Sequence, residues 1–167
     1  YLINTHAHQD HIGANDNFAE EAVIIAHENA RNRMLGKFYA LPGDPPKGLP
    51  DSVFSDEMTL HFNGEDIKLI YMPDAHTDGD IIVYFTDSKI VHMGDLLFAD
   101  AFPFVHLAFG GDVENYAERL KSIIDMMPAD VTYVPGHGGN YDSDAMKEYH
   151  AMLVAATELV RKEKEAG

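Results

Sequence analysis

Four candidate metal ligands lie within six residues near the start of the chain, in the run from Thr5 to His11 (THAHQDH). In an extended backbone, residues two apart point the same way, so His6 and His8 are expected to face one ion. Asp10 and His11 follow where the chain bends and can face a second ion. The sequence has no cysteine, and imidazole and carboxylate ligands without thiolate favour a catalytic zinc site.

Three further candidates lie at predicted junctions between strands and loops. His76 separates two strand-like segments, Asp95 follows the predicted strand Lys89–His92, and His137 follows the predicted strand Val131–Val134. Each of them alone is weak evidence for a ligand. Together with the first run they supply five histidines and two aspartates, which is enough for two ions that share one carboxylate.

Hydrophobic periodicity and turn residues predict the elements that must position these side chains. Strands are predicted at Tyr1–Asn4, Ala22–Ala26, Met58–Phe62, Asp66–Tyr71, Asp80–Phe85, Lys89–His92 and Val131–Val134. Helices are predicted at Glu28–Leu35, at Val113–Met127 with Asp112 as its N-cap, and at Ser143–Glu165 with Met146, Tyr149, Met152, Leu153, Ala156 and Val160 facing inward. Loops or irregular segments are predicted at Thr5–Asn17, Ala40–Asp51, Phe98–Gly111 and Pro135–Asn140. This order predicts a single α/β (α+β) domain over residues 1–167, with mixed sheets faced by helices.

The composition excludes several classes of function. The 167 residues contain 12 Lys and Arg against 28 Asp and Glu, which gives a net charge of −16. Because nucleic-acid affinity comes mostly from Lys and Arg, we expect no nucleic-acid partner, and the same charge disfavours an anionic membrane surface. No apolar run approaches the length of a membrane span. The sequence leaves the cellular compartment open.

The order HxHxDH, then H, D and H, resembles the metallo-β-lactamase superfamily. The downstream ligands also stand in settings typical of that family, namely HTDGD, GDLLF and PGHG. The resemblance runs from about residue 4 to residue 140 and implies an αββα sandwich with a dinuclear site on one edge. It implies that His6, His8 and His76 hold the first metal, that Asp10, His11 and His137 hold the second, and that Asp95 bridges the two.

The resemblance also implies an activity. It predicts a dinuclear zinc-dependent hydrolase in which a metal-bridging hydroxide attacks a small ester, lactone, lactam or thioester. Asp10 is the predicted catalytic residue, because it would bind metal and also orient the nucleophile. Iron or manganese are alternative metals. Tyr39, Lys47, Asn140 and Tyr141 are loop candidates for a donor to the reacting oxygen.

Individual positions narrow the expected substrate within the family. His8 stands where oxygen-reducing members carry Glu, which disfavours oxygen reduction. The segment after Asp95 lacks the Gly-Cys-Gly-Arg run that accompanies glutathione binding, which disfavours a glutathione thioester as substrate. Asp95 stands where most dedicated β-lactamases carry Cys or Ser, so at most weak lactamase activity is expected. Lactonases of the family keep all seven ligands, as this sequence does. The apolar residues Phe98, Phe102, Pro103, Phe104 and Val105 either wall a substrate pocket or pack against the sheet. His27, His61, His92, His106 and His150 are interpreted as structural or surface residues, with His92 packed near the site.

One departure from the family pattern leaves alternatives open. Family members carry several strands before the HxHxDH motif, where this sequence has only Tyr1–Asn4, so we expect the N-terminal part of the domain to be truncated. An exposed sheet edge would follow, and it favours a homo-oligomer. A truncated scaffold that binds metal or a partner without efficient catalysis is therefore a second hypothesis. An iron-dependent oxidoreductase on the same fold is a third.

Overall fold

The computed structural model describes residues 1–36 and 46–167, and its strands form two sheets. The smaller sheet has the order β1 (Leu2–Ile3), β2 (Ile24–His27) and β3 (Ser52–Phe54), and its strands are parallel. The larger sheet contains β4 (Glu57–Phe62), β5 (Glu65–Tyr71), β6 (Ile81–Phe85), β7 (Ile90–Phe98) and β8 (Thr132–His137) in sequence order. Its strands are antiparallel except for the parallel pair β7 and β8, so the larger sheet is mixed as predicted.

The two sheets pack face to face through apolar side chains. On β5, Ile67 and Leu69 are buried and alternate with exposed Asp66 and Lys68, as expected for a strand with one face in a core. They pack with residues of both sheets, namely Ile25, Phe54, Ile81 and Val83. The turn between β4 and β5 is made by Asn63 and Gly64, both with positive φ, which confirms the predicted hairpin.

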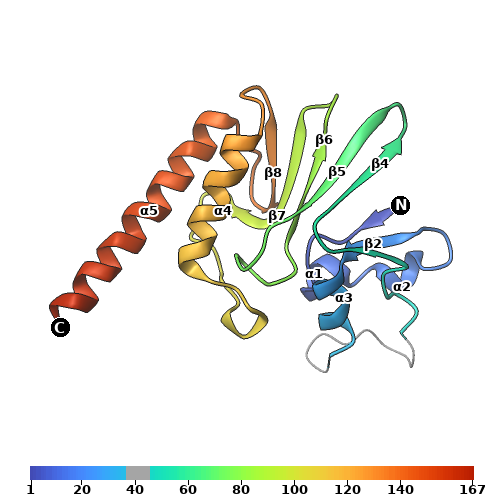
Figure 1. The fold of residues 1–167 in the computed structure, drawn as a ribbon, viewed down its shortest axis with the longest axis horizontal. Helices are drawn as coiled ribbons and strands as arrows, with labels where there is room; N and C mark the ends of the chain where they lie inside the picture. The colour runs from blue at the N-terminus through green and yellow to red at the C-terminus, as the bar shows by residue number, and fades with distance from the viewer. Residues whose placement is uncertain (37–45) are drawn as a thin grey trace.

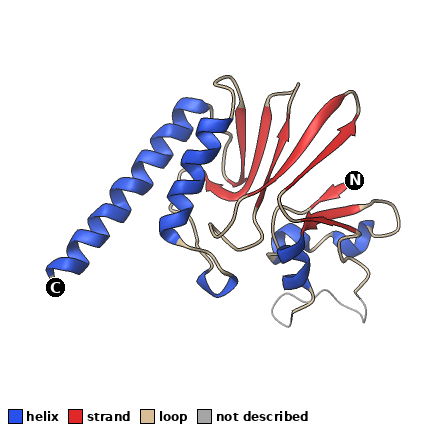
Figure 2. Cartoon of the chain, viewed as in Figure 1, coloured by secondary structure: helices blue, strands red, loops and turns tan. Residues whose placement is uncertain are grey.

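Helices cover the outer faces of the two sheets (Figures 1 and 2). The helices are α1 (Gln9–Ile12), α2 (Asn15–Phe18), α3 (Glu28–Met34), α4 (Val113–Met126) and α5 (Ser143–Ala166), with a 3-10 turn at Leu107–Phe109. Ala30 and Met34 of α3 pack with Ala26 of β2 and Ile12 of α1. The buried residues of α4 and α5 pack against β7 and β8. The resulting helix–sheet–sheet–helix order confirms the predicted sandwich.

The long helices begin where the sequence predicts. The Asp112 carboxylate accepts hydrogen bonds from the backbone N–H groups of Glu114 and Asn115 at 2.8 and 3.0 Å, which confirms its role as the N-cap of α4. Asp142 caps α5 in the same way. Within the described part of the chain, no helix is long and apolar enough to cross a membrane.

The structure corrects the sequence predictions in four places. The predicted loop Thr5–Asn17 contains α1 and α2, which at four residues each are too short to show a helical period. Strand β3 was not predicted, because its three residues cannot show alternation. Strands β7 and β8 continue to Phe98 and His137, beyond the predicted ends at His92 and Val134. The predicted loop Ala40–Asp51 is not among these corrections, because its residues 40–45 lie outside the described part of the chain.

The fourth correction concerns the end of α5. Met146, Tyr149 and Leu153 are buried as predicted, but the predicted inward residue Val160 is 67% exposed. Figure 1 shows why, because the last turns of α5 extend past the body of the protein. The apolar period of the sequence continues there without a surface to pack against.

Candidate metal centre

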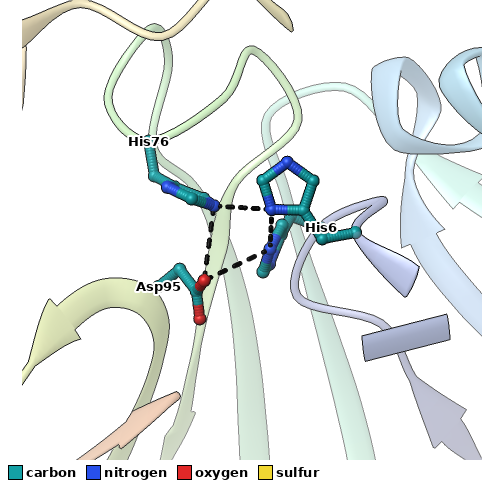
Figure 3. A group of neighbouring side chains, drawn as sticks. His6, His76 and Asp95 are labelled. Carbon is teal, nitrogen blue, oxygen red and sulfur yellow. Dashed lines mark hydrogen bonds and ion pairs between the residues drawn. The ribbon is translucent and has the colours of Figure 1, made fainter. Parts of the chain in front are cut away.

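Four buried side chains converge on one another, namely His6, His8, His76 and Asp95. The Nδ1 atom of His8 lies 3.0 Å from Nε2 of His6 and 2.9 Å from Nε2 of His76. The Oδ2 atom of Asp95 lies 3.7 Å from Nε2 of His6 and 3.4 Å from Nε2 of His76. Figure 3 shows His6 and His76 directed toward the Asp95 carboxylate from different parts of the chain. We call these four residues the first group.

A second group, Asp10, His11 and His137, lies beside the first and is closer to solvent. The Oδ2 atom of Asp10 is 3.5 Å from Nε2 of His11 and 3.3 Å from Nε2 of His137. Asp95 reaches this group too, since its Oδ1 lies 3.0 Å from Nε2 of His11 and its Oδ2 lies 3.5 Å from Nε2 of His137. The structure thus brings all seven predicted residues together, with Asp95 between the two groups.

The first segment is fixed by contacts to both sheets. The N–H of Asn4 donates to the carbonyl of Ile25 on β2, and the N–H of Ile81 on β6 donates to the carbonyl of Thr5. The Asn4 side chain also donates to the carbonyl of His11, which ties α1 to the end of β1. His6, His8 and His11 therefore start from a backbone anchored on two sides.

A bulge in β7 aims Asp95 into the site. The register between β7 and β8 shifts on either side of Gly94, whose φ is +51°. A Cβ atom there would lie 2.8 Å from the Cβ and Oγ1 of Thr5, so only glycine allows this approach. On β8, a Cβ at Gly136 would lie 2.1 Å from Oδ1 of Asp95. The two glycines let three chain segments meet at this carboxylate.

The turn that carries His76 is held by the buried carboxyl group of Asp80. Asp80 accepts hydrogen bonds from the backbone N–H of Thr77 at 2.7 Å and from its hydroxyl at 2.5 Å. Burial raises the pKa of Asp80 to about 8, against the opposing effect of the bonds from Thr77. The HTDGD run is therefore a structural turn as well as the setting of a candidate ligand.

The three histidines of the first group are held in their neutral form. Burial, with repulsion from the neighbouring imidazoles, lowers the pKa of His6 well below its usual value and lowers the pKa of His8 to about 4. Burial also lowers the pKa of His76. In the second group, burial alone would lower the pKa of His11, but the neighbouring carboxylates, Asp95 foremost, together have the larger effect and raise that pKa. Burial alone would raise the pKa of Asp95. The neighbouring imidazoles, His11 foremost, together have the larger effect and lower that pKa.

The tautomer of His76 shows that bare lone pairs face the centre of the site. Its Nδ1 lies 2.6 Å from the carbonyl oxygen of Phe104, and a carbonyl only accepts, so Nδ1 carries the hydrogen. The Nε2 of the neutral ring is then a lone pair directed at the first group. Among the described residues, the buried Oδ1 atom of Asp95 has no hydrogen-bond partner, although it lies 3.0 Å from Nε2 of His11. Converging lone pairs and an unsatisfied carboxylate oxygen fit a bound cation.

Metal removal should therefore destabilise the protein. A ligand present at 1,000 times its dissociation constant stabilises the native state by about 4 kcal/mol, which for a chain of this size corresponds to a shift in Tm on the order of 10 °C. We expect EDTA to lower the Tm of zinc-loaded protein by that amount in differential scanning calorimetry, and excess zinc to restore it. An unchanged Tm would contradict the presence of a high-affinity site.

Two residues that were not predicted from the sequence support the predicted ligands. The buried hydroxyl of Thr5 lies 3.2 Å from Nδ1 of His6 and 3.3 Å from Nδ1 of His11. A hydroxyl oxygen has two lone pairs and can accept a hydrogen bond from Nδ1 of both rings. The Nε2 of each ring then carries no hydrogen, and its lone pair can bind a metal ion. His106, interpreted from the sequence as structural or surface, lies 2.8 Å from His8 through their ring nitrogens. No sequence signal identifies His106, because it lies 98 positions from His8. Thr5 directly precedes the His6–His11 motif, and that position is a signal by which it could have been found.

Thr5→Val should weaken metal binding. Valine keeps the shape of threonine but removes the oxygen that orients His6 and His11, and the loss of such an outer contact costs about 10–100-fold in metal affinity. Competition with a chromophoric chelator measures this change. Thr59→Val, at an exposed position of β4, is the matched control and should bind metal as the wild type does. Equal affinities of the two variants would contradict a role for the Thr5 hydroxyl.

The remaining sequence candidates have varied surroundings. The Tyr141 hydroxyl accepts from the N–H of Asp100 at 2.7 Å, and Lys47 forms an exposed ion pair with Glu20. Tyr39 lies outside the described residues. Phe104 is 57% exposed, and its ring centroid lies 6.0 Å from that of His76, which favours the pocket-wall interpretation over packing in the core. His92 accepts a hydrogen bond from the N–H of Gly94, next to the site.

The sandwich and its paired histidine–carboxylate groups define a metallo-hydrolase of the metallo-β-lactamase fold. The chain belongs to the metallo-β-lactamase superfamily, whose family model matches residues 1–137. It is similar to a probable metallo-hydrolase of Bacillus subtilis, at 26% identity over 148 residues, or 84% of this chain and 69% of that protein. It is 30% identical over 101 residues to a hydroxyacylglutathione hydrolase of Pelagibacter ubique, covering 59% of this chain but only 36% of that enzyme.

Solved structures agree with this assignment of the fold. A metallo-β-lactamase from Pontibacter korlensis superposes with a TM-score of 0.75 at 20% identity, and the match covers 90% of this chain and 67% of that one. The chain thus spans about two thirds of the length of that structure.

Proposed function

We propose that the protein is a dinuclear zinc-dependent hydrolase of a small ester, lactone, lactam or thioester. The observation that carries this proposal is the pair of ligand groups that share Asp95, with the bare Nε2 of His76 directed at one of them. Imidazole and carboxylate donors without thiolate suit zinc in a catalytic site. Two such ions would act as Lewis acids and would lower the pKa of water toward 7.

The chain itself supplies the remaining functions of such a site. Asp95 would hold the two groups at a fixed separation, because it contacts imidazoles of both. Asp10 lies on the exposed side of the second group, 3.3 Å from His137, where its carboxylate can orient a nucleophile and accept its proton. The exposed ring of Phe104 would provide an apolar wall beside His76.

The test has two stages on protein purified without chelators or a metal-affinity tag. Elemental mass spectrometry should find about two zinc ions per chain, as the two ligand groups imply. A panel of lactones, lactams, esters and a hydroxyacylglutathione thioester should then show zinc-dependent hydrolysis that Asp10→Asn lowers. Bound zinc without hydrolysis of any substrate would favour the scaffold hypothesis. Bound iron and a coloured protein would favour the oxidoreductase.

A further inference from the structure

A short segment after β7 contacts two candidate ligands of the first group at once. The carbonyl of Phe104 accepts the hydrogen of His76 Nδ1 at 2.6 Å. Two residues later, the backbone N–H of His106 donates to the carbonyl of His76 at 2.9 Å, and the His106 ring approaches His8. The segment from Phe104 to His106 therefore lies against the first group from outside.

His8 is oriented differently from the other two histidines of its group. His6 and His76 present Nε2 to the centre, whereas His8 presents Nδ1. The Nε2 atom of His8 consequently points outward, and it lies 2.8 Å from Nδ1 of His106. When Nδ1 of a neutral His8 binds a metal ion, Nε2 carries the hydrogen, so His106 Nδ1 is the acceptor in this bond.

The His106 ring is itself held in place. It stacks on Phe109 with a centroid distance of 4.2 Å and an interplanar angle of 8°. Phe109 is buried, and the guanidinium of Arg33 lies 4.8 Å from its ring centroid. Arg33 in turn forms an ion pair with Asp78 at 2.6 Å. The acceptor nitrogen is therefore presented by a ring that is fixed before any metal binds.

We propose that His106 is a positioning residue for the metal ligand His8. It accepts the Nε2 hydrogen of His8 and so fixes the tautomer and the ring plane that direct Nδ1 to the first ion. This inference rests on the metal centre of the proposed function, but not on its substrate. Because outer contacts of this kind are worth about 10–100-fold in metal affinity, the loss of the acceptor should weaken binding of one ion by that factor.

The test compares variants that differ only in where they can place an acceptor. In His106→Asn the amide oxygen takes the place of Nδ1, whereas in His106→Gln it takes the place of Nε2, and His106→Leu removes the acceptor but keeps the bulk. We expect the Leu and Gln variants to bind one zinc ion about 10–100-fold more weakly in chelator competition, and the Asn variant to recover most of the affinity. His61→Leu, on an exposed histidine of β4, is the matched control.

Two further readouts separate positioning from a structural role. The visible spectrum of the cobalt-substituted protein should change in His106→Gln and return toward the wild type in His106→Asn. The Tm of the chelated protein should differ little between those two variants. Wild-type affinity in all variants, or an equal loss in the Asn and Gln variants, would overturn the inference; if the Leu variant does not fold, the Asn and Gln pair still decides.

The same experiment distinguishes this inference from the proposed function. If the wild type binds zinc, the His106 variants bind it more weakly as expected, and no substrate is hydrolysed, the proposed function is refuted and the positioning role is supported. Hydrolysis by a zinc-loaded enzyme whose metal affinity is insensitive to His106 would do the opposite. Wild-type protein that binds no metal would overturn both.

Discussion

Asp95→Asn is expected to lower the rate of hydrolysis by more than about 100-fold, because even an outer contact to a ligand is worth 10–100-fold. Asp95 is a candidate ligand rather than an outer contact, and it faces both groups, with oxygens 3.0 Å from Nε2 of His11 and 3.4 Å from Nε2 of His76. The amide keeps the volume of the carboxylate but removes its charge and turns an NH₂ group toward one set of donors. We therefore also expect fewer than two ions per chain.

Elemental analysis and kcat/KM on the best substrate of the panel measure the effect of Asp95→Asn. Asp66→Asn makes the same change on β5, where the aspartate contacts only an exposed histidine among the ion pairs of the described residues, and it should leave both quantities unchanged. An Asp95→Asn protein with two ions and the wild-type rate would rule out a shared carboxylate.

Gly136→Ala should damage the site without changing any ligand. The added Cβ would lie 2.1 Å from Oδ1 of Asp95 and 2.9 Å from the carbonyl carbon and oxygen of Gly94. The Gly94 contacts are backbone atoms in paired strands, so Asp95 must be displaced or the strands must separate. Overpacking of this kind costs about 1–3 kcal/mol, or roughly 2–12 °C in Tm for a chain of this length.

Metal analysis and calorimetry test Gly136→Ala together. We expect a lowered Tm and the loss of at least one bound ion. Gly139→Ala, three residues further on, is a suitable control because no heavy atom of the described residues would lie within 4 Å of its Cβ. If the two alanine variants melt alike and hold the same metal, then Asp95 does not depend on the close approach of β8.

The seven candidate ligands could be predicted from the sequence because their chemistry is carried by residue type and order. The run from His6 to His11 places four donors within a single turn region, and the later histidines and Asp95 stand in recognisable settings. The long helices α4 and α5 could be predicted as well, since an amphipathic period sustained over several turns is typical of a helix packed on a core. The predicted cap Asp112 bonds to its close neighbours in the sequence and is therefore visible locally. Asp142 caps α5 in the same local way, although it was not predicted.

The supporting contacts could not be predicted, because they depend on three-dimensional packing. The contact between His8 and His106 joins residues 98 positions apart, and the partner of His76 is a backbone carbonyl, which every residue carries. The extension of β7 through Asp95 was missed because Gly94 interrupts the strand pattern with a bulge. The short helices α1 and α2 follow from tertiary contacts rather than from periodicity.

The spread of the ligands along the chain has a consequence for folding kinetics. Asp95 meets imidazoles from residues 6, 11, 76 and 137, so the complete set exists only after the parallel pairing of β7 and β8 has closed a long stretch of chain. Such non-local contacts form late, after the entropy of loop closure has been lost. Interactions absent from the folding transition state act mainly on the unfolding rate. Zinc should therefore slow unfolding markedly while leaving the refolding rate nearly unchanged.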